Sequence, residues 1–138
     1  MKWSSDRARE AFTSSRIARL ATADSQGAPH LVPVTYAAYG DTVAIAVDSK
    51  PKSTHNLKRI RNIDENPRVS LLADEYDDDW TRLWWARADG SARVEHEGAA
   101  WFEARERLME RYVQYRESPP DAAIILINVH RWSGWSFR

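Results

Sequence analysis

Residues 17–47 read IARLATADSQGAPHLVPVTYAAYGDTVAIAV, and this stretch is the strongest indicator of the fold class. Three runs rich in apolar residues are separated by two groups of turn-forming residues: 17–23, 31–39 and 42–47 flank Asp24-Ser25-Gln26-Gly27 and Gly40-Asp41. Short runs of this composition, bounded by Gly, Asp and Ser, are typical of β-strands joined by turns. The stretch therefore predicts three consecutive strands of an antiparallel sheet.

Four later runs have the same character: residues 68–73, 83–88, 91–97 and 122–132. Asp89-Gly90 is a strong tight-turn signal and predicts a hairpin between the second and third of these runs. Apolar residues at helical spacing predict helices over 5–14, 54–64 and 99–116, with Pro67 and Pro119 following the last two. Six to seven antiparallel strands with about three peripheral helices predict a mainly β fold, a small β-barrel.

The composition narrows the class of protein. With 138 residues, 43% of them hydrophobic and 29% charged, the chain is expected to form a single globular domain over residues 1–138. A formal net charge of zero argues against a nucleic-acid partner. The longest apolar run, residues 122–127, is far shorter than a membrane span, and the first residues lack the apolar core of a signal peptide. No membrane association and a cytoplasmic location are expected.

The segment Asp48-Ser49-Lys50-Pro51-Lys52-Ser53-Thr54-His55-Asn56-Leu57 joins a predicted strand to a predicted helix. Ser53 or Thr54 can cap the amides at the helix start, where anions bind favourably. Lys50 and Lys52 add positive charge, so the loop has the features of a phosphate cradle. A second interpretation stays open, because polar strand-to-helix loops are common and both lysines could be ordinary solvated charges.

The chain contains seven tryptophans. Most are expected in the core or in a subunit interface, although flat rings in two groups, Trp80, Trp84 and Trp85 and then Trp132 and Trp135, could also line a flat ligand. Residues 124–127 of the last strand are apolar on both faces. We expect one face to be covered by a partner subunit, which predicts a homodimer.

No metal site is predicted. The four histidines are scattered, and His130 is the one expected nearest a ligand cleft. The acidic run at 74–79 lacks the spacing of a calcium loop and is expected to be solvated. Tyr36 and Tyr39 are possible proton donors, but aromatic strand residues more often serve packing.

Several short motifs together resemble one family: the flavin- and deazaflavin-binding split β-barrels related to pyridoxamine 5′-phosphate oxidase, in particular the small actinobacterial branch classed as coenzyme F420-dependent oxidoreductases. The motifs span nearly the whole chain: IARLAT at 17–22 with Gly27, HLVPVTY at 30–36, Lys50-Pro51-Lys52 with Asn56-Leu57, NPRVSLL at 66–72, and Asp79-Trp80 followed by LWWARADG at 83–90.

The resemblance implies an FMN-binding split barrel and a homodimer with two cofactor clefts, each built from both chains. It implies that the strand at Val32 to Tyr36 lays its backbone along the cofactor ring and that the 50–54 loop holds the phosphate side. The implied cofactor-binding residues are Val32, Pro33, Val34, Thr35, Lys50, Lys52, Ser53, Thr54, Asn56, Arg59, Trp80, Trp85 and Trp135. Family members often carry a basic residue where Ser53 stands, and Arg59 could supply that charge.

The implied reaction is hydride transfer from reduced F420 to an electron-poor small-molecule substrate. The cofactor would supply the chemistry, which explains why no acid–base constellation is seen in the sequence. The same barrel holds FMN in other family members, so an FMN-dependent oxidase or reductase is one alternative. A cofactor carrier without turnover is another.

Overall fold

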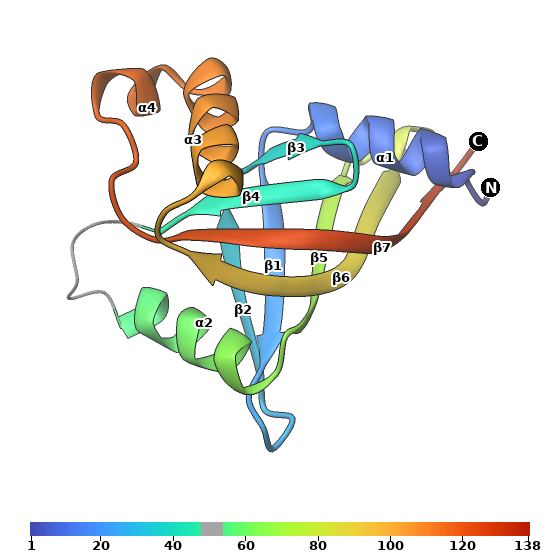
Figure 1. The fold of residues 1–138 in the computed structure, drawn as a ribbon. Helices are drawn as coiled ribbons and strands as arrows, with labels where there is room; N and C mark the ends of the chain where they lie inside the picture. Colours follow the sequence, from blue (N-terminus) through green and yellow to red (C-terminus); the bar gives the residue numbers. More distant parts are fainter. Residues whose placement is uncertain (48–53) are drawn as a thin grey trace.

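The computed structural model describes residues 1–47 and 54–138. Seven strands form one antiparallel sheet in the order β2-β1-β5-β6-β7-β4-β3 (Figure 1). The strands are β1 (Ala18–Ala23), β2 (Pro29–Val34), β3 (Ala37–Tyr39), β4 (Thr42–Ala46), β5 (Arg68–Glu75), β6 (Trp84–Glu95) and β7 (Ile124–Ser136). The helices are α1 (Ser5–Ser14), α2 (Thr54–Glu65), α3 (Ala99–Arg111), α4 (Val113–Glu117) and a short 3-10 helix, η1 (Trp80–Arg82). The predicted mainly β fold is confirmed.

The predicted strand over 31–39 is in fact two strands. Its first half, in β2, pairs with β1, and its second half, β3, pairs with β4. The chain changes partner at Thr35 and Tyr36, between the end of β2 and the start of β3. A period-two pattern cannot reveal this change, because the side chains keep alternating while the hydrogen-bonding partner changes.

The hairpin predicted at Asp89-Gly90 is wrong. Strand β6 continues through both residues, and only the pairing with β7 shifts register between them. A side chain at Gly90 would overlap the backbone carbonyl of Asn128 on β7. Glycine is needed here for the close approach of two strands at a bulge, and not for a turn.

The predicted helix over 99–116 is divided into α3 and α4 at Tyr112, whose backbone is extended (φ −121°, ψ 124°). The Tyr112 hydroxyl accepts a hydrogen bond from the Tyr36 N–H at 3.0 Å and donates one to the Tyr36 carbonyl oxygen at 2.9 Å. These bonds satisfy the backbone of Tyr36 where the sheet changes partner, and they are made by the residue at which the helical pattern is interrupted.

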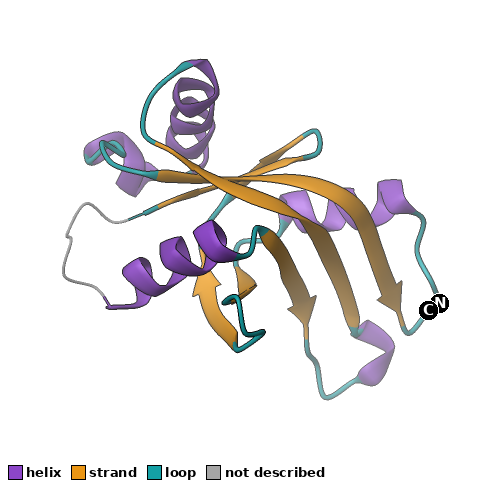
Figure 2. Ribbon diagram, turned by 60° about the horizontal axis from the view of Figure 1, so that its bottom comes forward, coloured by secondary structure: helices purple, strands orange, loops and turns teal. Residues whose placement is uncertain are grey.

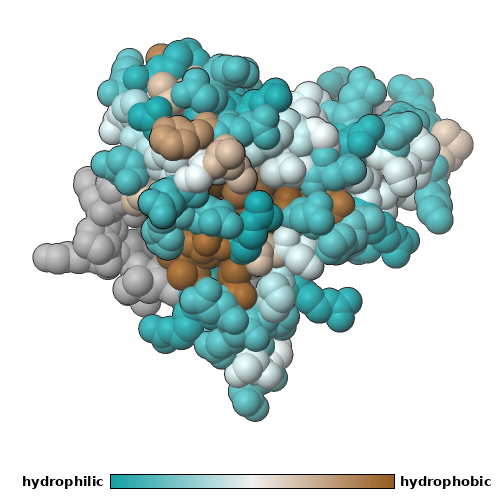
Figure 3. Space-filling view, in the orientation of Figure 1, coloured by the Kyte–Doolittle hydropathy of each residue, from teal (hydrophilic) through white to brown (hydrophobic). Residues whose placement is uncertain are grey.

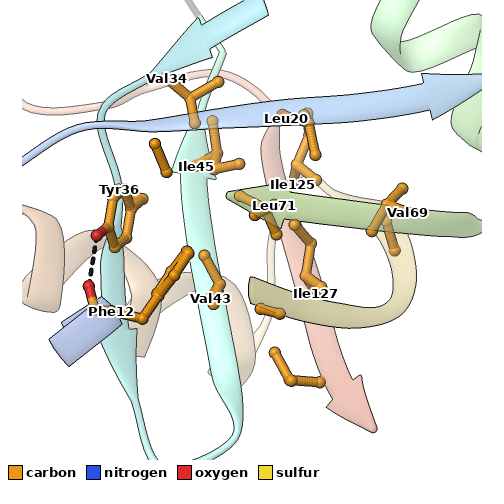
Figure 4. Close-up of a cluster of buried hydrophobic side chains, with 14 of the residues drawn as sticks. Phe12, Leu20, Val34, Tyr36, Val43, Ile45, Val69, Leu71, Ile125 and Ile127 are labelled. Carbon is orange, nitrogen blue, oxygen red and sulfur yellow. Dashed lines mark hydrogen bonds between the residues drawn. The ribbon is translucent and has the colours of Figure 1, made fainter. Parts of the chain in front are cut away.

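The main core lies inside the curved sheet and contains Phe12, Leu20, Tyr36, Leu71 and Ile125, among others (Figure 4). A second core packs Trp101, Ala104 and Leu108 of α3 against Ile124 and Leu126 on the other face of β4 and β7. The apolar outer face of residues 124–127 is therefore covered by α3. Our inference that this strand needs a partner subunit was wrong, because a helix of the same chain supplies the cover.

None of the described helices combines the length and the apolar character needed to cross a membrane. Three of the seven tryptophans, Trp3, Trp101 and Trp132, are buried, which is fewer than the majority expected from the sequence. The Trp132 indole N–H donates to Asp41 at 2.9 Å, and Arg9 of α1 contacts the same carboxylate. This contact holds α1 against the β3–β4 turn.

Candidate functional site

A cavity of about 480 Å³ opens where β2 and β4 end. Its walls come from four parts of the chain: the end of β2, the end of β4, helix α2, and the segment from α4 to β7. The lining residues are Pro33, Val34, Thr35, Ile45, Ala46, Val47, Arg59, Gln114, Tyr115, Ser118, Pro119, Pro120 and Asp121. In the space-filling view, hydrophobic surface is visible in a hollow between α2 and the α3–α4 region (Figure 3).

Arg59 brings a positive charge to this cavity from the second turn of α2. The residue is only 8% exposed. Burial lowers the pKa of its guanidinium, while the nearby Tyr115 acts in the opposite direction. An arginine side chain has so high an intrinsic pKa that it stays protonated. The wall formed by α2 therefore presents a permanent cation.

Two hydroxyl groups face each other in the same cavity. The Tyr115 hydroxyl on α4 lies 3.5 Å from the Thr35 hydroxyl oxygen. The Tyr115 ring packs edge-on against Tyr112, with ring centroids 5.6 Å apart and planes at 89°. Tyr112 is hydrogen-bonded to the backbone of Tyr36, the residue after Thr35, and its ring packs against Tyr115. Tyr112 therefore holds Tyr115 and Thr35 close to each other.

The cavity unites part of the predicted site. Pro33, Val34, Thr35 and Arg59 line it, and Val32 precedes them on β2, partly buried against the core. Thr54 and Asn56 lie in the first turn of α2. Lys50, Lys52 and Ser53 lie outside the described residues. In sequence they connect Val47, which lines the cavity, to the helix that carries Arg59.

The three predicted tryptophans lie elsewhere in the chain. Trp85 and Trp135 are paired across β6 and β7, and Trp80 on η1 is 61% exposed. At the cavity end of β7, Ile124 pairs with Ala46. Trp135 is eleven positions further along the strand, which corresponds to roughly 36 Å of extended chain. The tryptophans of this chain therefore do not reach its cavity.

Sequence reasoning missed the contribution of residues 114–121. This segment follows a helix that ends before two prolines, so its sequence reads only as a helix end and a connection. It lines the cavity because β7 pairs beside β4. The pairing brings together segments about 80 positions apart in sequence. The contact between Thr35 and Tyr115 spans the same separation.

Tyr36 is not a proton donor to a bound ligand. It is fully buried, and its hydroxyl donates to the carbonyl oxygens of Phe12 at 2.5 Å and Ser15 at 3.0 Å. Burial raises its pKa to about 12. The phenol therefore stays protonated and serves the packing of α1 on the sheet.

A second, more open concavity of about 580 Å³ lies over β1, β5, β6 and β7. Here Asp89 accepts hydrogen bonds from Ser70 at 2.8 Å and from Arg87 at 3.0 Å. His130, expected from the sequence near the ligand cleft, lies here instead, 3.0 Å from the Ser91 hydroxyl. Among the described residues, no three potential metal ligands are grouped closely enough to hold an ion.

Comparisons with known proteins identify the fold. A family model described as pyridoxamine 5′-phosphate oxidase matches residues 4–136. An FAD-binding protein from Mesorhizobium loti is similar over 97% of this chain and 95% of its own, with 22% identity and a TM-score of 0.74. The FAD-binding protein of Mycobacterium smegmatis is similar over 100% of both chains, with 17% identity and a TM-score of 0.72. A conserved hypothetical protein from Mycobacterium tuberculosis is similar over 99% of this chain and 86% of its own, with 24% identity and a TM-score of 0.73. No curated protein matches the sequence.

Proposed function

The chain belongs to the pyridoxamine 5′-phosphate oxidase family, and from this premise we propose that it is an oxidoreductase that binds the deazaflavin coenzyme F420 in the cavity beside β2 and β4. The observation that carries the proposal is the buried Arg59 in a cavity that also has apolar walls. A cofactor with a flat ring and an anionic tail needs both kinds of surface.

The residues present fit such a group. Val34, Ile45 and Val47 supply apolar contacts, whereas Arg59, Thr35 and Tyr115 supply hydrogen-bond donors and positive charge. A bound deazaflavin would supply hydride transfer to an electron-poor small-molecule substrate. The chain would orient the ring along residues 32–35 and exclude water from it. The predicted phosphate contacts of Lys50, Lys52 and Ser53 are part of this proposal.

FMN is the second candidate cofactor. The similar proteins from Mesorhizobium loti and Mycobacterium smegmatis are described as FAD-binding. Flavins share with F420 a three-ring system and a phosphorylated side chain, so the same cavity would accommodate either. The alternatives to an F420-dependent reductase are then an FMN-dependent oxidase or reductase, and a carrier that binds the cofactor without turnover.

We also propose that the protein is a homodimer. In Figure 2, β5, β6 and β7 have α1 behind them and no described helix in front. On the outward face of the same sheet, Leu31 of β2 (67% exposed) lies opposite Ala21 of β1, and Leu72 of β5 (37% exposed) lies between Arg19 of β1 and Arg87 of β6. Apolar side chains beside arginines are a combination common in subunit interfaces. A partner subunit placed here could bring Trp80, Trp85 or Trp135 toward the cavity of the first.

The test is a titration of the purified protein with oxidised F420 and, separately, with FMN, followed by intrinsic tryptophan fluorescence. Micromolar or tighter binding of F420 with weaker binding of FMN supports the proposal. Preference for FMN would reassign the protein as a flavoprotein. Tight binding without oxidation of reduced F420 by any electron-poor acceptor would favour the carrier. Binding of neither would refute the proposed function.

Two arginines on one helix provide a matched pair of variants. Arg59 lines the cavity, whereas Arg61, two residues later, is exposed and does not line it. Arg59→Gln should weaken cofactor binding about tenfold or more, because a charge-assisted hydrogen bond contributes about 1.5–3 kcal/mol. Arg61→Gln should bind as the wild type does. Equal loss in both variants would indicate only a general effect of charge.

A further inference from the structure

We infer that Tyr115 of α4 is a specificity-determining residue of this cavity: its hydroxyl, with Arg59 and Thr35, binds an anionic oxygen group of the ligand. A phosphate or a carboxylate has the required chemistry. The inference deepens the proposed function and depends on it for the identity of the ligand. It concerns a part of the chain that no sequence motif marks as functional.

The three groups come from three separate elements and meet in one cavity. Arg59 lies on α2, Thr35 lies between β2 and β3, and Tyr115 lies on α4. The hydroxyl oxygens of Tyr115 and Thr35 are 3.5 Å apart, and Arg59 lines the same cavity. An oxygen atom placed between two hydroxyls at this separation can accept a hydrogen bond from each. The guanidinium then supplies the compensating charge.

The position of Tyr115 is fixed from both sides of α4. On the N-terminal side, Tyr112 is bonded to the backbone of Tyr36 and its ring packs against Tyr115. On the C-terminal side, Arg105 donates to the carbonyl oxygen of Pro120 at 3.0 Å. The Trp101 indole N–H donates to the carbonyl oxygen of Ala122 at 2.9 Å. A hydroxyl held in this way loses little entropy when a ligand binds.

The local charge favours an anion over a neutral group. Arg59 is buried and positively charged, and hydroxyl groups can donate to an oxyanion without a change in protonation. One carboxylate, Asp121, also lines the cavity, but its residue is exposed to solvent. Water screens an exposed charge more strongly than a buried one, so the field of Arg59 should dominate at Tyr115.

The experiment compares FMN with riboflavin, the same molecule without its phosphate, and F420 with its deazariboflavin core, which lacks the phosphate and the tail attached to it. Wild type, Tyr115→Phe and the control Tyr76→Phe are titrated with all four molecules. Tyr76 is exposed on the loop after β5 and does not line the cavity. Tyr115→Phe should weaken binding of the phosphorylated cofactor about tenfold, as expected for one hydrogen bond to a charged group. Its affinity for the dephosphorylated form should be unchanged, and Tyr76→Phe should match wild type throughout.

The outcomes separate this inference from the proposed function. If wild type binds a cofactor and Tyr115→Phe binds it equally well, the role of Tyr115 is refuted while the proposed function stands. An equal loss of affinity for the cofactor and for its dephosphorylated form would assign Tyr115 to the ring and would also overturn the inference.

If wild type binds neither cofactor, the proposed function fails, and inorganic pyrophosphate titrated by calorimetry decides the question for Tyr115. Binding that is reduced in both Tyr115→Phe and Arg59→Gln would support the anion subsite. Absence of pyrophosphate binding would refute it. Thermal unfolding of each variant checks that a loss of binding is not a loss of fold.

Discussion

The hydroxyl group of Tyr112 bridges both backbone polar groups of Tyr36, accepting from its N–H at 3.0 Å and donating to its carbonyl oxygen at 2.9 Å. The two residues are 76 positions apart in sequence. One side chain thus replaces the strand neighbour that Tyr36 lacks where the sheet changes partner. Tyr112 is also the residue between α3 and α4, and its ring packs against Tyr115, which lines the candidate site.

Removing this hydroxyl should destabilise the protein. In Tyr112→Phe, the N–H and carbonyl groups of Tyr36 both lose a partner, and unsatisfied buried polar groups cost about 1–3 kcal/mol each. We expect the free energy of unfolding in urea to fall by about 2 kcal/mol, with Tyr76→Phe as an exposed control. Unchanged stability of Tyr112→Phe would show that water replaces the hydroxyl.

The buried Tyr36 should make the fold sensitive to alkali. Its pKa is raised to about 12 by burial, from an ordinary value of 10.0. Below pH 10 the phenol is protonated in both the folded and the unfolded chain, so its full contribution is present. Between pH 10 and 12 only the unfolded chain loses the proton, and stability should fall by on the order of 2 kcal/mol.

This pH dependence is measured by denaturant unfolding at pH 8, 10 and 11. Tyr36→Phe should be less stable at pH 8, because the hydrogen bonds to Phe12 and Ser15 are lost. Its stability should also decline less steeply above pH 10 than that of the wild type. If the stability of both proteins fell equally steeply above pH 10, the loss of stability in alkali would come from groups other than Tyr36.

Gly90 should tolerate no side chain. Its ideal Cβ position overlaps the carbonyl of Asn128, which is backbone and cannot move aside as a flexible side chain can. We expect Gly90→Ala to lower the free energy of unfolding by about 2–3 kcal/mol or to prevent folding. Gly27→Ala is the control: Gly27 has φ +81° with open space around it, so only about 1 kcal/mol of backbone strain is expected. Comparable stability of the two variants would contradict the close approach at the bulge.

A charge on the open sheet face should prevent dimer formation. Leu31 lies in the outward-facing row of β2, opposite Ala21 of β1, and is 67% exposed. Leu31→Asp should shift the protein from dimer to monomer in sedimentation equilibrium, because a carboxylate buried in the interface opposite an alanine has no cation directly across the strand to compensate it. Phe102→Asp, on the surface of α3, should remain dimeric. A wild-type protein that sediments as a monomer would refute the proposed dimer directly.

Much of the secondary structure was predictable because it is encoded locally. The helix over 5–14 forms with the predicted bounds, and Ser4 caps it by accepting from the Arg7 N–H at 3.2 Å. The helix predicted over 54–64 extends by one residue to Glu65. The three errors, at 35–36, 89–90 and 112, lie where a distant segment provides the hydrogen-bond partner or the steric limit. In each case the tertiary contact overrides the local preference.

The candidate site also has a part that could be predicted from the sequence and a part that could not. The residue types that suit an anionic, flat cofactor could be read from the sequence, and Arg59 and residues 33–35 do line one cavity. Tyr115 could not be found, since its place beside Thr35 depends on β7 pairing with β4 and on the Tyr112 anchor.

The sequence by itself determined the periodicities, the turns at Gly27 and Gly40 and the mainly β class, because these depend on side chains within a few positions of one another. Only the tertiary structure decided that β4 pairs with β7, that α3 covers residues 124–127, and where the cavity lies. Those features depend on which distant surfaces are buried together, and burial is a property of the folded chain as a whole.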